Sequence, residues 1–154
     1  MADDGAPVMI VETDPDLASF HLLEEWLYEL NVKITGITDG KLLSIFLRKP
    51  DGAVIGGTHG WTWAGRCYVR LLYVPPDLRG RGCGTRLMQA VEQEARARGC
   101  HEIVLHTHVF QAPEFYRKLG FTVSGRQEFP RGHQFFEMVK VLRSADASAG
   151  RGAA

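Results

Sequence analysis

The sequence has no excess of charge of either sign. Across its 154 residues, 18 lysines and arginines balance 18 aspartates and glutamates, and the net charge is zero when the histidines are neutral. Domains that bind nucleic acid or an anionic membrane surface usually carry a basic excess. We therefore expect neither partner, although a local cluster of basic residues would still matter.

The sequence also lacks long apolar runs and paired cysteines. No stretch approaches the roughly 18 consecutive apolar residues of a membrane-spanning helix. The N-terminal stretch is acidic and has neither the basic nor the apolar region of a signal peptide. The three cysteines, Cys67, Cys83 and Cys100, form no CxxC pair, which favours free thiols in a reducing compartment. We expect a cytoplasmic protein with no membrane span and no metal site.

The remaining composition predicts one domain of the α/β class. About 45% of the residues are hydrophobic, which is enough for a sizeable core. We expect a single domain over residues 1–143, followed by a disordered tail of small and polar residues over 144–154. The expected order of elements, β-α-β-β-β-α-β-α-β-β, gives a mixed, mostly antiparallel central sheet of six or seven strands, flanked by about four helices.

Local patterns set the expected element boundaries. A short β-rich run predicts a first strand over residues 8–13, and Asp14 is the candidate N-cap of a helix from Pro15 to Leu30. An extra helical turn is expected near residues 32–37. The other expected strands cover residues 41–49, 53–63, 67–74, 102–110, 121–129 and 133–142. Two more helices are expected, one from Thr85 that ends before Gly99 and one over residues 112–120.

The most informative stretch is the glycine-rich turn "RGRGCG" at residues 79–84. It lies between an apolar strand and an amphipathic helix, so its glycines would let an anion approach the unpaired N–H groups at the helix start. Arg79 and Arg81 add positive charge. The pattern indicates a phosphate or pyrophosphate site, and a turn that only reverses the chain is the alternative. A Walker loop needs a lysine that this turn lacks, and Thr85 interrupts the dinucleotide-binding glycine pattern.

Two motifs together resemble the GCN5-related N-acetyltransferase (GNAT) family. The first is Arg/Gln-x-x-Gly-x-Gly/Ala before an amphipathic helix, and the second is Ala-x-x-x-Tyr-x-x-x-Gly-Phe after the next strand. The matching residues are Arg79, Gly82 and Gly84 in the first motif and Ala112, Tyr116, Gly120 and Phe121 in the second. The expected element order over residues 8–142 also resembles that of the family.

The resemblance implies an acetyl-CoA-dependent N-acetyltransferase that acts on a primary amine of a small molecule or peptide by direct attack in a ternary complex. The turn would hold the CoA pyrophosphate, the preceding strand would pair with the pantetheine arm, and two parallel strands would splay to admit the thioester. A CoA-binding or sensing module without catalysis is the alternative, and the resemblance also allows a homodimer. The residues implied in cofactor binding are Leu72, Tyr73, Val74, Arg79, Gly80, Arg81, Gly82, Cys83, Gly84, Thr85, Gln111, Ala112, Phe115 and Tyr116.

The same resemblance makes Tyr116 the candidate general acid. It matches the tyrosine that commonly protonates the CoA thiolate in the family, and the alternative is a packing residue beside Phe115. One departure from the family lies nearby, because Val109 stands where relatives often have asparagine. Gln111 would either replace that asparagine at the cofactor arm or cap the following helix.

The general base is open at this point. Many relatives carry a glutamate on the strand before the turn, around the positions of Tyr68 and Arg70, and this sequence has no carboxylate there. His106 and His108 alternate along the next expected strand and share one of its faces. Either histidine could accept a proton near neutral pH or could be structural. The weaker candidates are His59 and Glu114.

Overall fold

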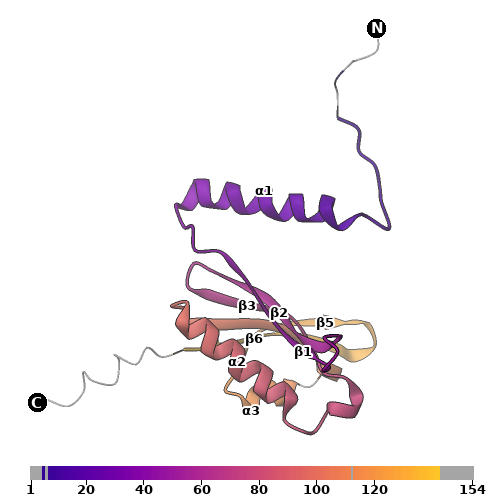
Figure 1. Cartoon of the computed structure of the whole chain (residues 1–154), viewed down its shortest axis with the longest axis vertical. Helices are drawn as coiled ribbons and strands as arrows, with labels where there is room; N and C mark the ends of the chain where they lie inside the picture. Colours follow the sequence, from indigo (N-terminus) through magenta and orange to yellow (C-terminus); the bar gives the residue numbers. More distant parts are fainter. Residues whose placement is uncertain (1–4, 6, 112, 143–154) are drawn as a thin grey trace, which may run out of the picture. The chain divides into compact units, whose positions relative to one another are not determined.

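The computed structural model describes residues 5, 7–111 and 113–142 (Figure 1). The tail expected over residues 144–154 lies outside these ranges. The chain divides between Ile37 and Thr38 into an N-terminal unit and a larger C-terminal unit. Within the described ranges, no helix is both long and apolar enough to cross a membrane. That residues 1–143 form a single domain stays a prediction.

The N-terminal unit contains one long helix, α1 (Leu17–Thr35). Its N-cap is Asp16, whose Oδ1 accepts a hydrogen bond from the backbone N–H of Ser19 at 2.8 Å. The helix ends at Gly36, which has a left-handed φ of 73° and therefore suits glycine. The predicted N-cap, Asp14, was wrong by two positions, because the aspartate that reaches an N–H of the first turn decides where the helix begins.

Two other predictions for the N-terminal unit were wrong. Residues 8–13 form neither strand nor helix, because a short β-rich run gains little stability without a partner strand. The helical turn expected near residues 32–37 is not a separate element but the end of α1. The periodicity was read correctly, and the length of the helix was underestimated.

The C-terminal unit is built on a six-stranded sheet with the order β1-β2-β3-β4-β6-β5. The pair β3–β4 is parallel and the other neighbouring pairs are antiparallel. This confirms the mixed, mostly antiparallel sheet. The strands are β1 (Lys41–Arg48), β2 (Val54–Trp63), β3 (Arg66–Tyr73), β4 (Glu102–His108), β5 (Thr122–Phe129) and β6 (His133–Val141).

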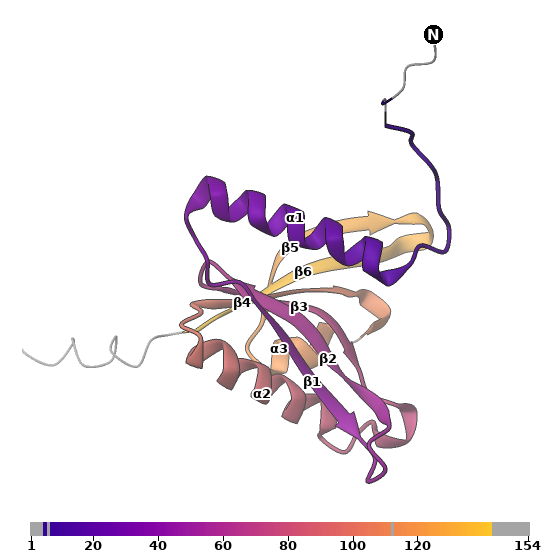
Figure 2. The same cartoon turned by 45° about the horizontal axis from the view of Figure 1, so that its top comes forward.

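Two helices, α2 (Cys83–Ala97) and α3 (Pro113–Lys118), lie on one side of this sheet (Figures 1 and 2). The described part of the chain therefore has three α-helices, counting α1. The salt bridge between Lys140 Nζ of β6 and Glu92 Oε2 of α2, at 2.5 Å, joins α2 to the sheet. The predicted apolar stripe of α2 is buried and consists of Leu87, Met88, Val91 and Ala95.

The parallel pair β3–β4 splays after a short ladder. Four residue pairs form, from Arg66↔Glu102 to Val69↔Leu105. Beyond this point β3 continues beside β2, and β4 continues beside β6. Among the described residues, the edge of β3 that faces away from β2 has no strand partner after Val69. Its N–H and C=O groups are therefore available to something that enters between the two strands.

A β-bulge marks the place where the strands diverge. The register of β2 against β3 shifts between His59 and Gly60, so that His59 is opposite Leu71 and Gly60 is opposite Val69. A Cβ atom at Gly60 would lie 1.8 Å from the carbonyl oxygen of Tyr68, so only glycine fits opposite the bulge. Bulges bend a strand and re-aim its side chains, and they often occur beside active sites.

Candidate active site

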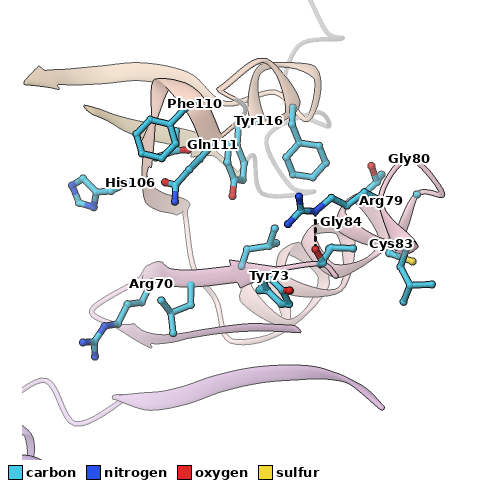
Figure 3. Close-up of a pocket in the computed structure, with 18 residues that line it drawn as sticks. Arg70, Tyr73, Arg79, Gly80, Cys83, Gly84, His106, Phe110, Gln111 and Tyr116 are labelled. Atoms are coloured by element: carbon cyan, nitrogen blue, oxygen red, sulfur yellow. Dashed lines mark hydrogen bonds between the residues drawn. The ribbon is translucent and has the colours of Figure 1, made fainter. Parts of the chain in front are cut away.

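A cavity of about 680 Å³ lies where β3 and β4 diverge. Figure 3 shows Arg70 and Tyr73 of β3 on one side of it, and His106, Phe110, Gln111 and Tyr116 on the other. The cavity brings together most of the predicted site residues. Those on its wall are Leu72, Tyr73, Val74, Arg79, Gly80, Gly82, Cys83, Gly84, Thr85, His106, Gln111, Phe115 and Tyr116.

Two predicted site residues, Arg81 and His108, do not line the cavity. A third, Ala112, lies outside the described residues. The cavity also has lining residues that the sequence reasoning missed, among them Arg70 and Phe110. Arg70 is adjacent to the predicted cofactor strand. The bulge that marks its position becomes visible only in the register of the sheet.

The glycine-rich turn presents the N-terminus of α2 to the cavity. The guanidinium Nε of Arg79 donates to the carbonyl of Val74 at 2.9 Å, which ties the turn to the end of β3 (Figure 3). Gly80 and Gly82 have left-handed φ angles of 70° and 78°, which glycine adopts without strain. Gly82 is the N-cap of α2 and supplies no side-chain hydrogen bond. The first N–H groups of the helix are therefore not capped by a side chain and can bind an anion.

Gly84, in the first turn of α2, packs closely against the ring of Phe115. A Cβ atom at this position would lie 3.1 Å from Cζ of Phe115, so a larger residue would have to displace that ring. The two signature motifs therefore meet directly, one through Gly84 and the other through Phe115.

Tyr116 is buried but faces the cavity. It is 7% exposed, and its ring packs edge-to-face against Phe115 at 5.0 Å and Phe121 at 5.8 Å between centroids. Burial raises the pKa of its phenol above the ordinary value. The hydroxyl, which points toward β3 in Figure 3, is thus protonated at neutral pH. A protonated phenol in this position can donate a proton into the cavity.

His106 lines the cavity and has a carboxylate partner. Its Nε2 lies 3.5 Å from Oε2 of Glu137, and its ring stacks on Phe135 with centroids 5.2 Å apart. The other oxygen of Glu137 accepts a hydrogen bond from Ser124 Oγ at 2.7 Å. Glu137 was missed from the sequence, because only the pairing of β4 with β6 places it opposite His106.

His108 packs among aromatic rings beyond the cavity wall. Its ring centroid lies 4.9 Å from that of Phe110, 5.8 Å from that of Phe129 and 4.8 Å from that of Phe135. Its backbone N–H donates to the side-chain oxygen of Gln111 at 3.1 Å. Gln111 thus fixes the chain at the end of β4 while it also lines the cavity. These contacts favour His106 over His108 as the candidate base.

The weaker candidates for the base have other partners. Nδ1 of His59 lies 2.7 Å from Ser44 Oγ, and Glu114 forms an ion pair with Arg117. Neither residue lines the cavity. In the described ranges, no group of three or more histidine, cysteine, aspartate or glutamate side chains could hold a metal ion.

Comparison with known proteins decides the family. Residues 10–121 match the model of the acetyltransferase (GNAT) family. The chain belongs to the GNAT family. An acetyltransferase of Agrobacterium fabrum is 39% identical over 95 residues, which cover 62% of this chain and 69% of that protein. The blasticidin-S acetyltransferase of Streptomyces morookaense is 35% identical over 96 residues, which cover 59% of this chain and 68% of that protein.

Solved structures of GNAT type share the fold. A crystal structure from Agrobacterium tumefaciens, assigned as an acetyltransferase, matches with a TM-score of 0.75 at 30% identity and covers 88% of this chain and 100% of that chain. An aminoglycoside 6′-N-acetyltransferase complexed with coenzyme A shares the fold at 20% identity, with a TM-score of 0.58 and coverage of 84% and 88%. The GNAT resemblance and the fold class are confirmed. Acetyl-CoA as the acyl donor and N-acetyl transfer as the reaction class are also confirmed. These findings favour an enzyme over a CoA-binding module without catalysis.

Proposed function

We propose that this GNAT protein transfers the acetyl group of acetyl-CoA to a primary amine of a small molecule or peptide, by direct attack in a ternary complex. One observation carries the proposal. The parallel ladder ends at Val69 and Leu105, and the cavity that opens there is lined by both the glycine-rich turn and Tyr116. Relatives named for blasticidin S and glucosamine 6-phosphate support a small-molecule acceptor.

The residues present fit acetyl-CoA. The N-terminus of α2, with its left-handed glycines and no side-chain cap, suits the pyrophosphate. The edge of β3 at residues 71–73, beyond the end of the parallel ladder, suits the amide groups of the pantetheine arm, which would add to the sheet like a short strand. Acetyl-CoA supplies an activated acyl group as a thioester. A backbone N–H near residues 72–74 would stabilise the charge that develops on the acyl oxygen.

Two side chains would move the protons. The amine nitrogen forms a bond to the acyl carbon, and the bond from that carbon to sulfur breaks. His106 takes the proton that the amine loses, directly or through water, and Tyr116 gives its proton to the departing sulfur. The products are the acetylated amine and free CoA. Glu137 would act as a positioning residue, because its contact with Nε2 leaves Nδ1 of His106 to accept the proton.

The wider setting of the enzyme is predicted from the sequence alone. We propose a cytoplasmic location, a homodimer and no nucleic-acid partner. The balanced charge and the free thiols support the first and last of these. Size-exclusion chromatography with light scattering tests the oligomeric state, and a monomer at micromolar concentration would contradict the homodimer.

Ligand binding tests the proposal first. The purified protein is titrated with acetyl-CoA, CoA, ATP and NADH, and its thermal unfolding is followed. Acetyl-CoA at about 100 times its dissociation constant should stabilise the fold by roughly 2.7 kcal/mol, whereas ATP and NADH should not. CoA release is then measured against a panel of amines. A protein that no CoA species stabilises would contradict the proposed function.

A further inference from the structure

A cluster of aromatic rings borders the cavity where β4 ends. We refer to it as the aromatic cluster. Its rings contact one another in pairs, with centroid separations between 4.8 and 6.1 Å. Its members are His106, His108, Phe110, Phe129, His133 and Phe135.

Strand pairing places most of the aromatic cluster on one face of the sheet. His108 of β4 is opposite Phe135 of β6, and Phe129 of β5 is opposite His133 of β6. Residues directly opposite each other in an antiparallel pair point to the same face. Glu137 shares this face, because it is the partner of His106. The rings therefore surround the edge of the site that carries the candidate base and its carboxylate.

Two members of the aromatic cluster also line the cavity. His106 and Phe110 belong to the cavity wall, so the rings continue directly from the place where the thioester would lie. Phe110 is 67% exposed and Phe129 is 43% exposed, although both rings contact histidine rings. Exposed phenylalanine rings beside a cavity indicate a surface on which an apolar part of a ligand can pack.

We propose that the aromatic cluster is the acceptor subsite, and that it takes an amine carried by an aromatic ring on a short linker. The inference rests on the proposed acetyl transfer and adds the substrate class. An aromatic ring can stack on Phe110 as the ring of His108 does, at 4.9 Å and nearly parallel. The carboxylate of Glu137 would attract the ammonium form of the same molecule on approach. The ammonium would lose one proton to solvent, and the neutral amine would then attack and give its second proton to His106.

The carboxylate of Glu137 supports a cationic acceptor on the side of the site that carries the aromatic cluster. Among the described residues, the wall of the cavity contains Arg70 and Arg79 but no carboxylate, and Glu137, the partner of His106, is an acidic group on the same face as the cluster. A cationic amine approaching from this side encounters that carboxylate first. The apolar rings then favour a flat apolar body behind the amine over a polyamine or a sugar.

The test compares two amines that differ in aromaticity alone. The first is 2-phenylethylamine and the second is 2-cyclohexylethylamine, which has the same linker and carbon skeleton. Stacking between aromatic rings favours the first amine by about two- to tenfold in kcat/KM. Phe110→Leu keeps an apolar side chain and removes the ring, so the preference should fall to about one. Phe46→Leu, an exposed phenylalanine of β1, should keep the preference.

The affinity for acetyl-CoA separates this proposal from the proposed function. Acetyl-CoA should stabilise the wild-type protein and Phe110→Leu alike in thermal unfolding. If acetyl-CoA binds but the two amines react equally, or neither reacts, the aromatic acceptor is wrong while the proposed cofactor stands. A preference for the aromatic amine that survives in Phe110→Leu would also overturn the aromatic acceptor subsite. The same holds if Phe110→Leu dissociates a dimer and leaves the amine preference unchanged. Failure to bind acetyl-CoA at all would instead overturn the proposed function.

Discussion

Tyr116 is the residue with the sharpest chemical prediction. Tyr116→Phe keeps the ring that packs against Phe115 and Phe121 and removes only the proton donor. We expect kcat to fall by about tenfold or more, with acetyl-CoA affinity little changed. Steady-state kinetics and thermal-shift titration measure the two effects. Tyr68→Phe, at a tyrosine that stacks on Trp61 outside the cavity, is the matched control, and an unchanged kcat in Tyr116→Phe would remove Tyr116 from the mechanism.

His106 is the candidate group that takes the proton from the amine. His106→Gln keeps a polar side chain and removes the imidazole, so we expect kcat/KM to fall by about a hundredfold, with acetyl-CoA affinity little changed. Steady-state kinetics and thermal-shift titration measure the two effects. His108→Gln, at a histidine that does not line the cavity, is the matched control, and a larger fall in His108→Gln than in His106→Gln would exchange the roles of the two histidines.

At the scale of elements, the turn that begins α2 should control cofactor binding. Gly84→Glu places a carboxylate against the helix N-terminus and pushes on Phe115, whose ring is 3.1 Å from the new Cβ position. The carboxylate would occupy the N–H groups meant for the pyrophosphate. We expect the thermal shift with acetyl-CoA to be lost. Gln89→Glu adds the same charge on the exposed face of α2 and should bind normally, and normal binding by Gly84→Glu would mean that the pyrophosphate lies elsewhere.

Elements marked by strong local signals were predictable from the sequence. The four-residue apolar stripe of α2 is buried as predicted, because a helix with one apolar face has one stable way to meet a sheet. The β-rich run over residues 8–13 is a local signal too. A strand is stable only beside a partner strand, however, and a local pattern does not show whether that partner exists. The choice between Asp14 and Asp16 as N-cap depended on the two hydrogen bonds that Ser19 donates to Asp16.

The residues of the candidate site also divide into those that a short motif marks and those that no local pattern marks. Tyr116 and the glycine-rich turn belong to short motifs, so the sequence could name them before their geometry was known. Glu137 and Phe110 carry no motif. Glu137 joins the site only through the register of β6 against β4, and Phe110 through the turn that follows β4. The register of the sheet and the turn after β4 therefore bring in the residues on the acceptor side, whereas short motifs mark the cofactor side.

At the scale of the whole molecule, stability depends on the layer between the sheet and α2. Val91 of α2 and Ile103 and Met138 of the sheet are fully buried there. Cys67 of β3 belongs to the same core and is 1% exposed. Burial, with a smaller contribution from Cys100, raises the pKa of the Cys67 thiol from 9.0 to about 12. The core thus contains a group that resists ionisation while the protein is folded.

This thiol should make the whole fold sensitive to alkali. Between pH 9 and 12 the unfolded chain loses the Cys67 proton while the folded protein keeps it, so the free energy of unfolding falls as pH rises. At pH 10 the loss from this group is about 1 kcal/mol relative to pH 7. Urea denaturation at both pH values measures it.

Two variants isolate the contribution of Cys67. Cys67→Ala should lower stability at pH 7 through the cavity it leaves and reduce the loss on going to pH 10 by about 1 kcal/mol. Part of the loss should persist, because burial also raises the pKa values of Cys100 and Tyr116. Cys83→Ala changes a half-buried cysteine that lines the cavity. This variant should lose as much stability between pH 7 and pH 10 as the wild type. If Cys67→Ala and the wild type lose the same free energy of unfolding between pH 7 and pH 10, the thiol is accessible to water in the folded protein. The layer between α2 and the sheet would then open before the molecule unfolds.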